Sequence, residues 1–168
     1  MPRSKLRSAS FRNDQRRVLT KILVDADGCP VKQEIYRVAK RYGLKVVLAA
    51  NSRMQIPDDD SVELVIVKGH LDAADDWIVE HVGKEDVVIS SDVPLASRAL
   101  KKGARVVGCN GYIFTQDSIG SALASRDLRS YLRDFGVMTG GPAPFSKRDR
   151  SHFLQSLDQT IQSIRRGK

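Results

Sequence analysis

The chain has 168 residues, of which 41% are hydrophobic, and a formal net charge of +8. A chain of this length suits one domain with a proper core and is too short for two comfortable ones. Its two cysteines stand 80 positions apart, which excludes a disulfide framework and predicts a cytoplasmic protein. No apolar run approaches the roughly 20 residues that span a bilayer, so we expect no membrane anchor.

The positive charge belongs to the two ends of the chain. Residues 1–20 hold six Lys or Arg and one acid, and residues 165–168 hold three more basic residues, so the stretch 21–164 is neutral overall. We therefore expect a basic, disordered leader over 1–20, a single domain over 21–164 and a basic tail over 165–168. Basic arms of this kind attract phosphate without sequence specificity.

Strand-like and helix-like segments alternate along the middle of the chain. Short apolar runs predict strands, and apolar residues at helical spacing, opened by proline and closed by glycine, predict helices. The expected strands are 22–24, 45–50, 62–67, 87–89 and 105–107, and the expected helices are 30–42, 73–82 and 94–102, with further helix from 118, a rigid loop at 140–144 and a last helix from Ser146, capped through Asp149.

This alternation is typical of a parallel sheet with helices on its faces. The predicted fold class is therefore α/β, with three α/β/α layers, a mainly parallel sheet of about four to five strands and a helical C-terminal part.

Aspartates follow three of the expected strands, at the edge where open α/β sheets bind ligands. They are Asp25 and Asp27, then Asp72, Asp75 and Asp76, then Asp92. An isolated acid here could simply gain about 0.3–1 kcal/mol from a helix dipole. Aspartates at three strand ends at once favour the binding of a hard cation, Mg²⁺ or Mn²⁺, because the cation relieves the repulsion between the carboxylates. A site of this kind supports the hydrolysis of phosphoesters.

Four separated motifs, at 24–32, 72–78, 91–96 and 140–150, resemble the YaiI/YqxD family of bacterial proteins, which is allied to the PIN-like nucleases. The resemblance covers about 21–161 and implies a PIN-like fold and a metal-dependent nuclease acting on RNA. It implies that Asp25 and Asp92 are site acids, that Asp75 or Asp76 is the middle acid, and that Ser90 replaces the usual threonine.

Several residues near these motifs could contact a phosphate of the substrate. Lys32 lies in the first turn of a helix, and the Gly-Gly-Pro loop leads into another helix N-terminus, which suits an anion. The candidates for substrate binding are Lys32, Ser91, Ser146, Lys147, Arg148 and Arg150. Ion pairs on the protein surface explain the basic residues among these as simply as phosphate binding does. Cys29 is better explained as a small packed side chain than as a nucleophile.

Three hypotheses follow from these residues. The first is a Mg²⁺- or Mn²⁺-dependent phosphodiesterase that uses Asp25, Asp75, Asp76 and Asp92, with Asp27 and Asp72 in support. The second is a non-catalytic module that binds RNA or the ribosome through its basic ends. The third is a phosphatase of the haloacid-dehalogenase type, since Asp25-Ala26-Asp27-Gly28 resembles its nucleophile motif, although the later acids stand in the wrong order for it.

Overall fold

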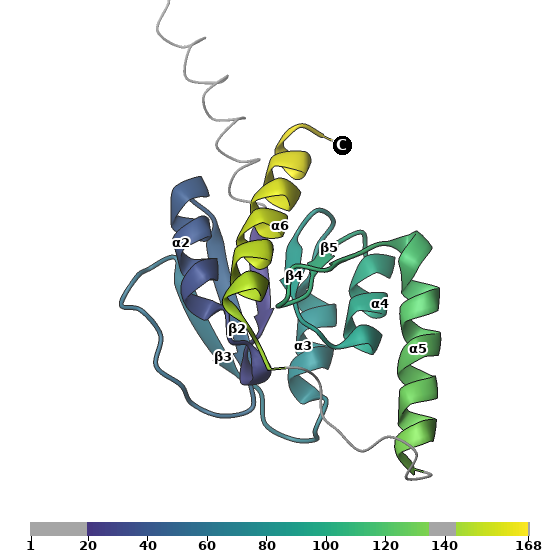
Figure 1. Ribbon diagram of the computed structural model, residues 1–168. Coiled ribbons are helices and arrows are strands. Elements are labelled where there is room, and N and C mark those ends of the chain that lie inside the picture. Colours follow the sequence, from purple (N-terminus) through teal and green to yellow (C-terminus); the bar gives the residue numbers. More distant parts are fainter. Residues whose placement is uncertain (1–19, 135–143, 168) are drawn as a thin grey trace, which may run out of the picture.

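The structure, a computed structural model, describes residues 20–134 and 144–167. Over these residues it is a three-layer α/β/α arrangement built on a six-stranded sheet (Figure 1). The strands are β1 Lys21–Asp25, β2 Lys45–Ala50, β3 Val62–Ile66, β4 Val87–Ile89, β5 Arg105–Val107 and β6 Ile113–Phe114, and the helices are the 3₁₀ turn η1 Ala26–Gly28, α2 Lys32–Tyr42, α3 Ala73–His81, α4 Val93–Lys101, α5 Gln116–Asp134 and α6 Lys147–Arg165.

The strand order in the sheet is β3-β2-β1-β4-β5-β6. Strands β1 to β5 are parallel, and only β6 at one edge is antiparallel. After β1, the chain adds β2 and then β3 on one side of β1. Helix α3 then leads to β4 on the other side of β1, and β5 and β6 follow beyond β4. The order of the strands therefore reverses between β1 and β4, and a crevice outside the carboxyl ends of the strands is expected at that point.

Helices cover both faces of the sheet and bury its central strands, whereas the edge strand β3 is mostly half-buried. Alternate residues of β1 show this, because Ile22 and Val24 pack toward α2 and α6 while Leu23 packs toward α3, α4 and α5. All three side chains have no exposed surface. Burial on both faces is the reason that the strands are continuous apolar runs in the sequence.

Most of the expected elements are present, with small shifts at their ends. Helix α2 begins at Lys32, two residues after the predicted start at Pro30, because η1 and a turn occupy 26–31. It ends as expected at Gly43, whose φ of 66° suits glycine. Ser146 caps α6 and forms the predicted reciprocal pair with Asp149.

Some expectations differ from the structure or lie outside it. The short edge strand β6 was not predicted, and α5 begins at Gln116 rather than Ser118. The expected disordered leader falls on residues of which only Thr20 is described, and the expected rigid loop at 140–144 lies outside the described residues except for Pro144. Within the described ranges no helix is both long and apolar enough to cross a membrane.

Helix α6 is the last element of the chain, yet it supplies the centre of one core layer. Phe153, Leu157 and Ile161 are fully or almost fully buried against α2 and the sheet. We expect Phe153→Ala to lower the free energy of unfolding by about 3–5 kcal/mol, because it leaves a cavity in a close-packed layer. Gln155→Ala on the exposed side of the same helix should change it by less than about 0.5 kcal/mol. Urea denaturation of the two variants measures both effects, and equal losses would contradict this packing.

Candidate acidic site

A hydrogen-bonded link joins the ends of β1 and β4 at the point where the strand order reverses. Ser90, which is 1% exposed, follows β4 and donates its hydroxyl to Asp25 Oδ2 over 3.0 Å. The same hydroxyl oxygen accepts the backbone N–H of Asp92, also over 3.0 Å. Asp92 in turn caps α4 by accepting the N–H of Leu95 at 2.9 Å. Asp25 and Asp92 are therefore held on neighbouring strands by a single buried side chain.

The third acid of this group is Asp75, from the first turn of α3. The pKa of Asp75 is raised to about 6, chiefly by partial burial and then by the negative charges of Asp25, Asp92 and Asp72. Burial also raises the pKa of Asp25, the Ser90 hydrogen bond lowers it, and the charges of Asp92 and Asp27 add to the increase. Aspartates that are up to 67 positions apart in the sequence thus lie within electrostatic range of one another.

Asp76 is not part of this group, although it is adjacent to Asp75 in the sequence. Its carboxylate pairs with His70 Nε2 at 2.8 Å and with Arg98 Nη1 of α4 at 2.7 Å. The hydrogen bonds to His70 and Arg98 lower the pKa of Asp76. The family resemblance left Asp75 and Asp76 as alternatives for the middle acid of the site. In the structure Asp75 lies in electrostatic range of Asp25 and Asp92, whereas Asp76 forms an exposed ion pair with Arg98.

Asp27 and Asp72 lie at the margin of the group. Asp27 is exposed in η1, where its Oδ2 accepts the backbone N–H of Asn51 at 2.8 Å, and Asp72 is exposed just before α3. We call Asp25, Asp27, Asp72, Asp75 and Asp92 the acidic cluster. In the described part of the chain, no three His, Cys, Asp or Glu side chains are already gathered closely enough to hold a metal ion. The acidic cluster is thus an electrostatic grouping and not a preformed cage.

Two of the basic residues that were expected to contact phosphate make hydrogen bonds near the start of α2. Lys32 Nζ donates to Cys29 O at 3.2 Å, and Arg150 donates to Pro30 O at 2.8 Å and to Glu34 at 3.1 Å. The Arg150 contacts place the N-terminus of α6 against the connection that follows β1. Lys147 and Arg148 are exposed there, and no described carboxylate lies within ion-pair distance of them.

Two of the residues predicted to contact substrate also take part in structural hydrogen bonds. The Ser91 hydroxyl oxygen accepts the backbone N–H of Cys109 at 3.1 Å. The Ser146 hydroxyl accepts the N–H of Asp149 at 3.2 Å in the capping box of α6. Both serines therefore support the local structure of the edge, and any contact with substrate has to be made alongside these bonds.

The two cysteines meet at this edge, which was not predicted from the sequence. Cys29 and Cys109 are buried, and their Sγ atoms lie 3.9 Å apart. The hydrogen bond between the two thiols lowers the pKa of Cys109 to about 7. A signal was available, because each cysteine closely follows a strand whose carboxyl end lies at the same edge of the sheet. Residues that follow parallel strands lie at one edge of the sheet, and this rule applies to the two cysteines as it does to the aspartates.

The sequence of this chain matches a protein family and several bacterial relatives. The family model described as "Uncharacterized BCR, YaiI/YqxD family" matches residues 23–163. The chain belongs to the YaiI/YqxD family. A UPF0178 protein of Brucella ovis and another of Brucella suis are each 58% identical over 147 residues, which cover 87% of this chain and 91% of theirs. A UPF0178 protein of Brucella melitensis is 57% identical over the same share of both chains.

No solved structure matches this YaiI/YqxD chain. The family match confirms the resemblance drawn from the sequence motifs, and its range includes the whole acidic cluster and both cysteines. The family and its relatives carry no assigned activity in their descriptions. The function of the edge therefore has to be argued from its own residues.

The pH dependence of stability tests the acidic cluster directly. The pKa of Asp75 is about 6 in the folded protein and 3.8 for an ordinary aspartate. Between these values the folded state keeps a proton that the unfolded chain has released, so the contribution of Asp75 to stability is lost as the pH rises from about 4 to about 6. Asp75→Asn should remove this decline, so that the variant gains in free energy of unfolding relative to wild type across the window.

Urea denaturation at a series of pH values measures the effect. Asp60→Asn is the matched control, because its exposed side chain lies just before β3 at the opposite edge of the sheet. If the difference in free energy of unfolding between wild type and Asp75→Asn stays constant with pH, Asp75 is not crowded by the other carboxylates.

Proposed function

We propose that this YaiI/YqxD protein is a Mg²⁺- or Mn²⁺-dependent phosphodiesterase that acts on RNA, with Asp25, Asp75 and Asp92 as its acidic groups. The observation that carries the proposal is the link between Asp25, Ser90 and Asp92 at the reversal point of the sheet, with Asp75 in electrostatic range. Crowded carboxylates that are partly withdrawn from water are stabilised by a hard cation.

The donor set fits such a cation, although the cage is not complete. Mg²⁺ usually keeps several waters and binds proteins through one or two carboxylates together with phosphate oxygens of the substrate. Asp25 with either Asp75 or Asp92 supplies that number of carboxylates, so three gathered protein ligands are not required. The bound ion would polarise a phosphoryl oxygen and lower the pKa of an attached water.

The protein's own residues would divide the remaining tasks. The hydrogen bond from Ser90 favours the charged form of Asp25 and would orient its carboxylate, as a metal ligand requires. Asp75, with a pKa of about 6, is poised near neutral pH to accept a proton from an attacking water. Cation binding would lower the pKa of Asp75, since the positive charge offsets its negative neighbours.

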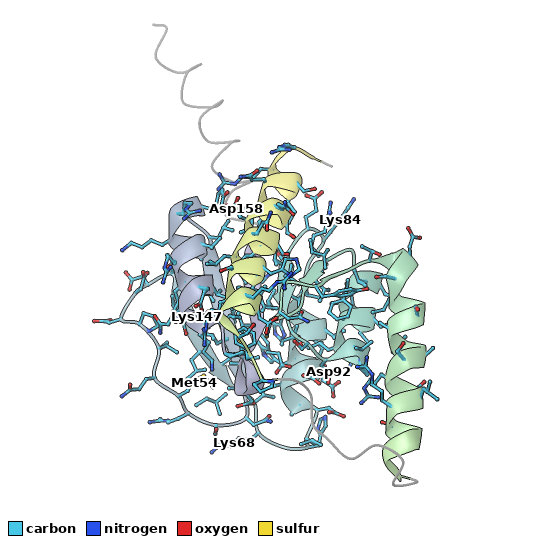
Figure 2. All side chains as sticks on the ribbon, in the orientation of Figure 1. Met54, Lys68, Lys84, Asp92, Lys147 and Asp158 are labelled. Carbon is cyan, nitrogen blue, oxygen red and sulfur yellow. The ribbon has the colours of Figure 1, made fainter. Side chains whose placement is uncertain are left out.

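An RNA backbone has basic groups available beside the acidic cluster. Lys147 and Arg148 begin α6, which contacts the connection after β1 through Arg150. Figure 2 shows Lys68 and Asp92 toward the lower end of the molecule, at the carboxyl edge of the sheet, and Lys84 toward the upper end. Cations around an acidic centre can hold flanking phosphates while the scissile one lies at the carboxylates.

Cleavage of RNA with Mn²⁺ tests the assignment of the acids. Asp25→Asn, Asp75→Asn and Asp92→Asn should each lower the rate about a hundredfold or more, because each removes a charge that positions the cation or accepts the proton. Asp76→Asn should cause a much smaller loss, since the carboxylate of Asp76 is committed to Arg98 and His70. Initial rates on a labelled single-stranded RNA measure the series.

The controls separate the proposal from its rivals. Asp60→Asn should cleave as wild type does, and EDTA should stop cleavage. Equal rates in all variants would refute the assignment of the acids. Binding of RNA without cleavage, unaffected by EDTA, would instead support the non-catalytic module, and hydrolysis of a small phosphomonoester in preference to RNA would support the phosphatase.

The basic side of the edge makes a separate prediction about RNA binding. The double variant Lys147→Glu with Arg148→Glu should bind RNA more weakly, and the slope of log affinity against log salt should fall by roughly 0.7 for each phosphate that the protein no longer neutralises. Lys84→Glu is the control, because Lys84 precedes β4 and lies at the opposite edge of the sheet. Fluorescence anisotropy at several salt concentrations measures both, and equal effects of the two changes would contradict a binding surface at the N-terminus of α6.

A further inference from the structure

The two cysteines are the only ones in the chain, and the fold places their sulfurs in contact. Cys29 is 6% exposed and Cys109 is 7% exposed, and their Sγ atoms are 3.9 Å apart. The S–S bond of a disulfide is about 2.05 Å long, so the two sulfurs need to approach by about 2 Å to form one. We infer that Cys29 and Cys109 form a reversible intramolecular disulfide, which makes this pair a redox modification site of the protein.

Both cysteines stand on connections and not inside strands, so the approach does not require any strand pair to separate. Cys29 lies between η1 and α2, and Cys109 lies two residues after the end of β5. Cys109 is attached to the neighbouring connection by its backbone N–H, which donates to Ser91 Oγ. Short connections at a strand edge adjust by small changes in backbone angles, whereas the parallel pairing of β1, β4 and β5 can remain as it is.

The chemistry balances with a peroxide as the oxidant. One cysteine gives up its thiol proton and its thiolate attacks a peroxide oxygen, so that the O–O bond breaks, the cysteine becomes a sulfenic acid, and the departing hydroxide takes up the proton and leaves as water. The second thiol then attacks that sulfur, the S–S bond forms, and a second water leaves. Overall the two thiols lose two protons and two electrons, and hydrogen peroxide is reduced to two molecules of water. A dithiol reverses the change by thiol–disulfide exchange.

The disulfide would act on the acidic cluster through two short paths along the chain. Asp27 lies two residues before Cys29, and Ser91, which holds Cys109, stands between Ser90 and Asp92. Drawing the sulfurs together displaces at least one of these connections. We expect oxidation to lower RNA cleavage reversibly. This consequence rests on the proposed function, whereas formation of the disulfide does not.

The test treats the full-length folded protein with hydrogen peroxide and then alkylates all free thiols in denaturant. Wild type should lose two hydrogens in its intact mass, take up no alkylating agent and show the Cys29 and Cys109 peptides joined in a digest. Dithiothreitol should restore two alkylated thiols. Cys29→Ser and Cys109→Ser each retain one thiol, so neither should give an internal cross-link, and circular dichroism checks that both remain folded.

The outcomes distinguish the inference from the proposed function. Two alkylated thiols in oxidised wild type, or oxygen added to one cysteine without a cross-link, would overturn the disulfide. An oxidised protein that carries the cross-link and cleaves RNA at the rate of the reduced protein would overturn the coupling to the acidic cluster. If the protein proves to have no nuclease activity, the mass measurement and the conclusion drawn from it still stand.

Discussion

The carboxyl edge of this sheet depends on one hydroxyl group. Ser90 can donate a single hydrogen, and it donates to Asp25 while its oxygen accepts from the backbone of Asp92. These two bonds tie together the neighbouring strands at which the order of the sheet reverses. The bond from Ser90 to Asp25 also opposes the two effects that raise the pKa of Asp25, which are withdrawal from water and the like charges beside it.

The same bond accounts for the difference between the two acids with raised pKa values. Asp25 and Asp75 are both raised chiefly by burial and then by neighbouring carboxylates. Asp25 has the Ser90 donor to offset part of the increase, whereas among the described residues the influence that opposes it at Asp75 is the charge of Arg98, which is itself engaged by Asp76. Under the proposed function, this donor would favour Asp25 as the charged ligand and leave Asp75 as the proton acceptor.

The sequence predicts the layers and the ends of the strands well, because strands buried on both faces are apolar without interruption. Asp25 and Asp92 follow directly from this pattern, since each comes just after such a run. The choice between Asp75 and Asp76 does not follow, because both lie in the first turn of α3. It is made by Arg98, a residue of another helix, and no local pattern reports a tertiary ion pair. The two-residue strand β6 has too few positions to show a period.

Under the two proposals, reciprocity would connect the cysteine pair with the acidic cluster. Coupling between two sites is a free energy, so if the disulfide changes the affinity of the cluster for a cation, bound cation changes the equilibrium of the disulfide by the same factor. The connection that carries this coupling is short, since Ser91 holds Cys109 and is adjacent to both Ser90 and Asp92. A cation that draws Asp25 and Asp92 together would act on the same segment as the approach of the two sulfurs. Within the two proposals, the three residues after β4 are therefore one of the two connections through which the disulfide and the cation would affect each other.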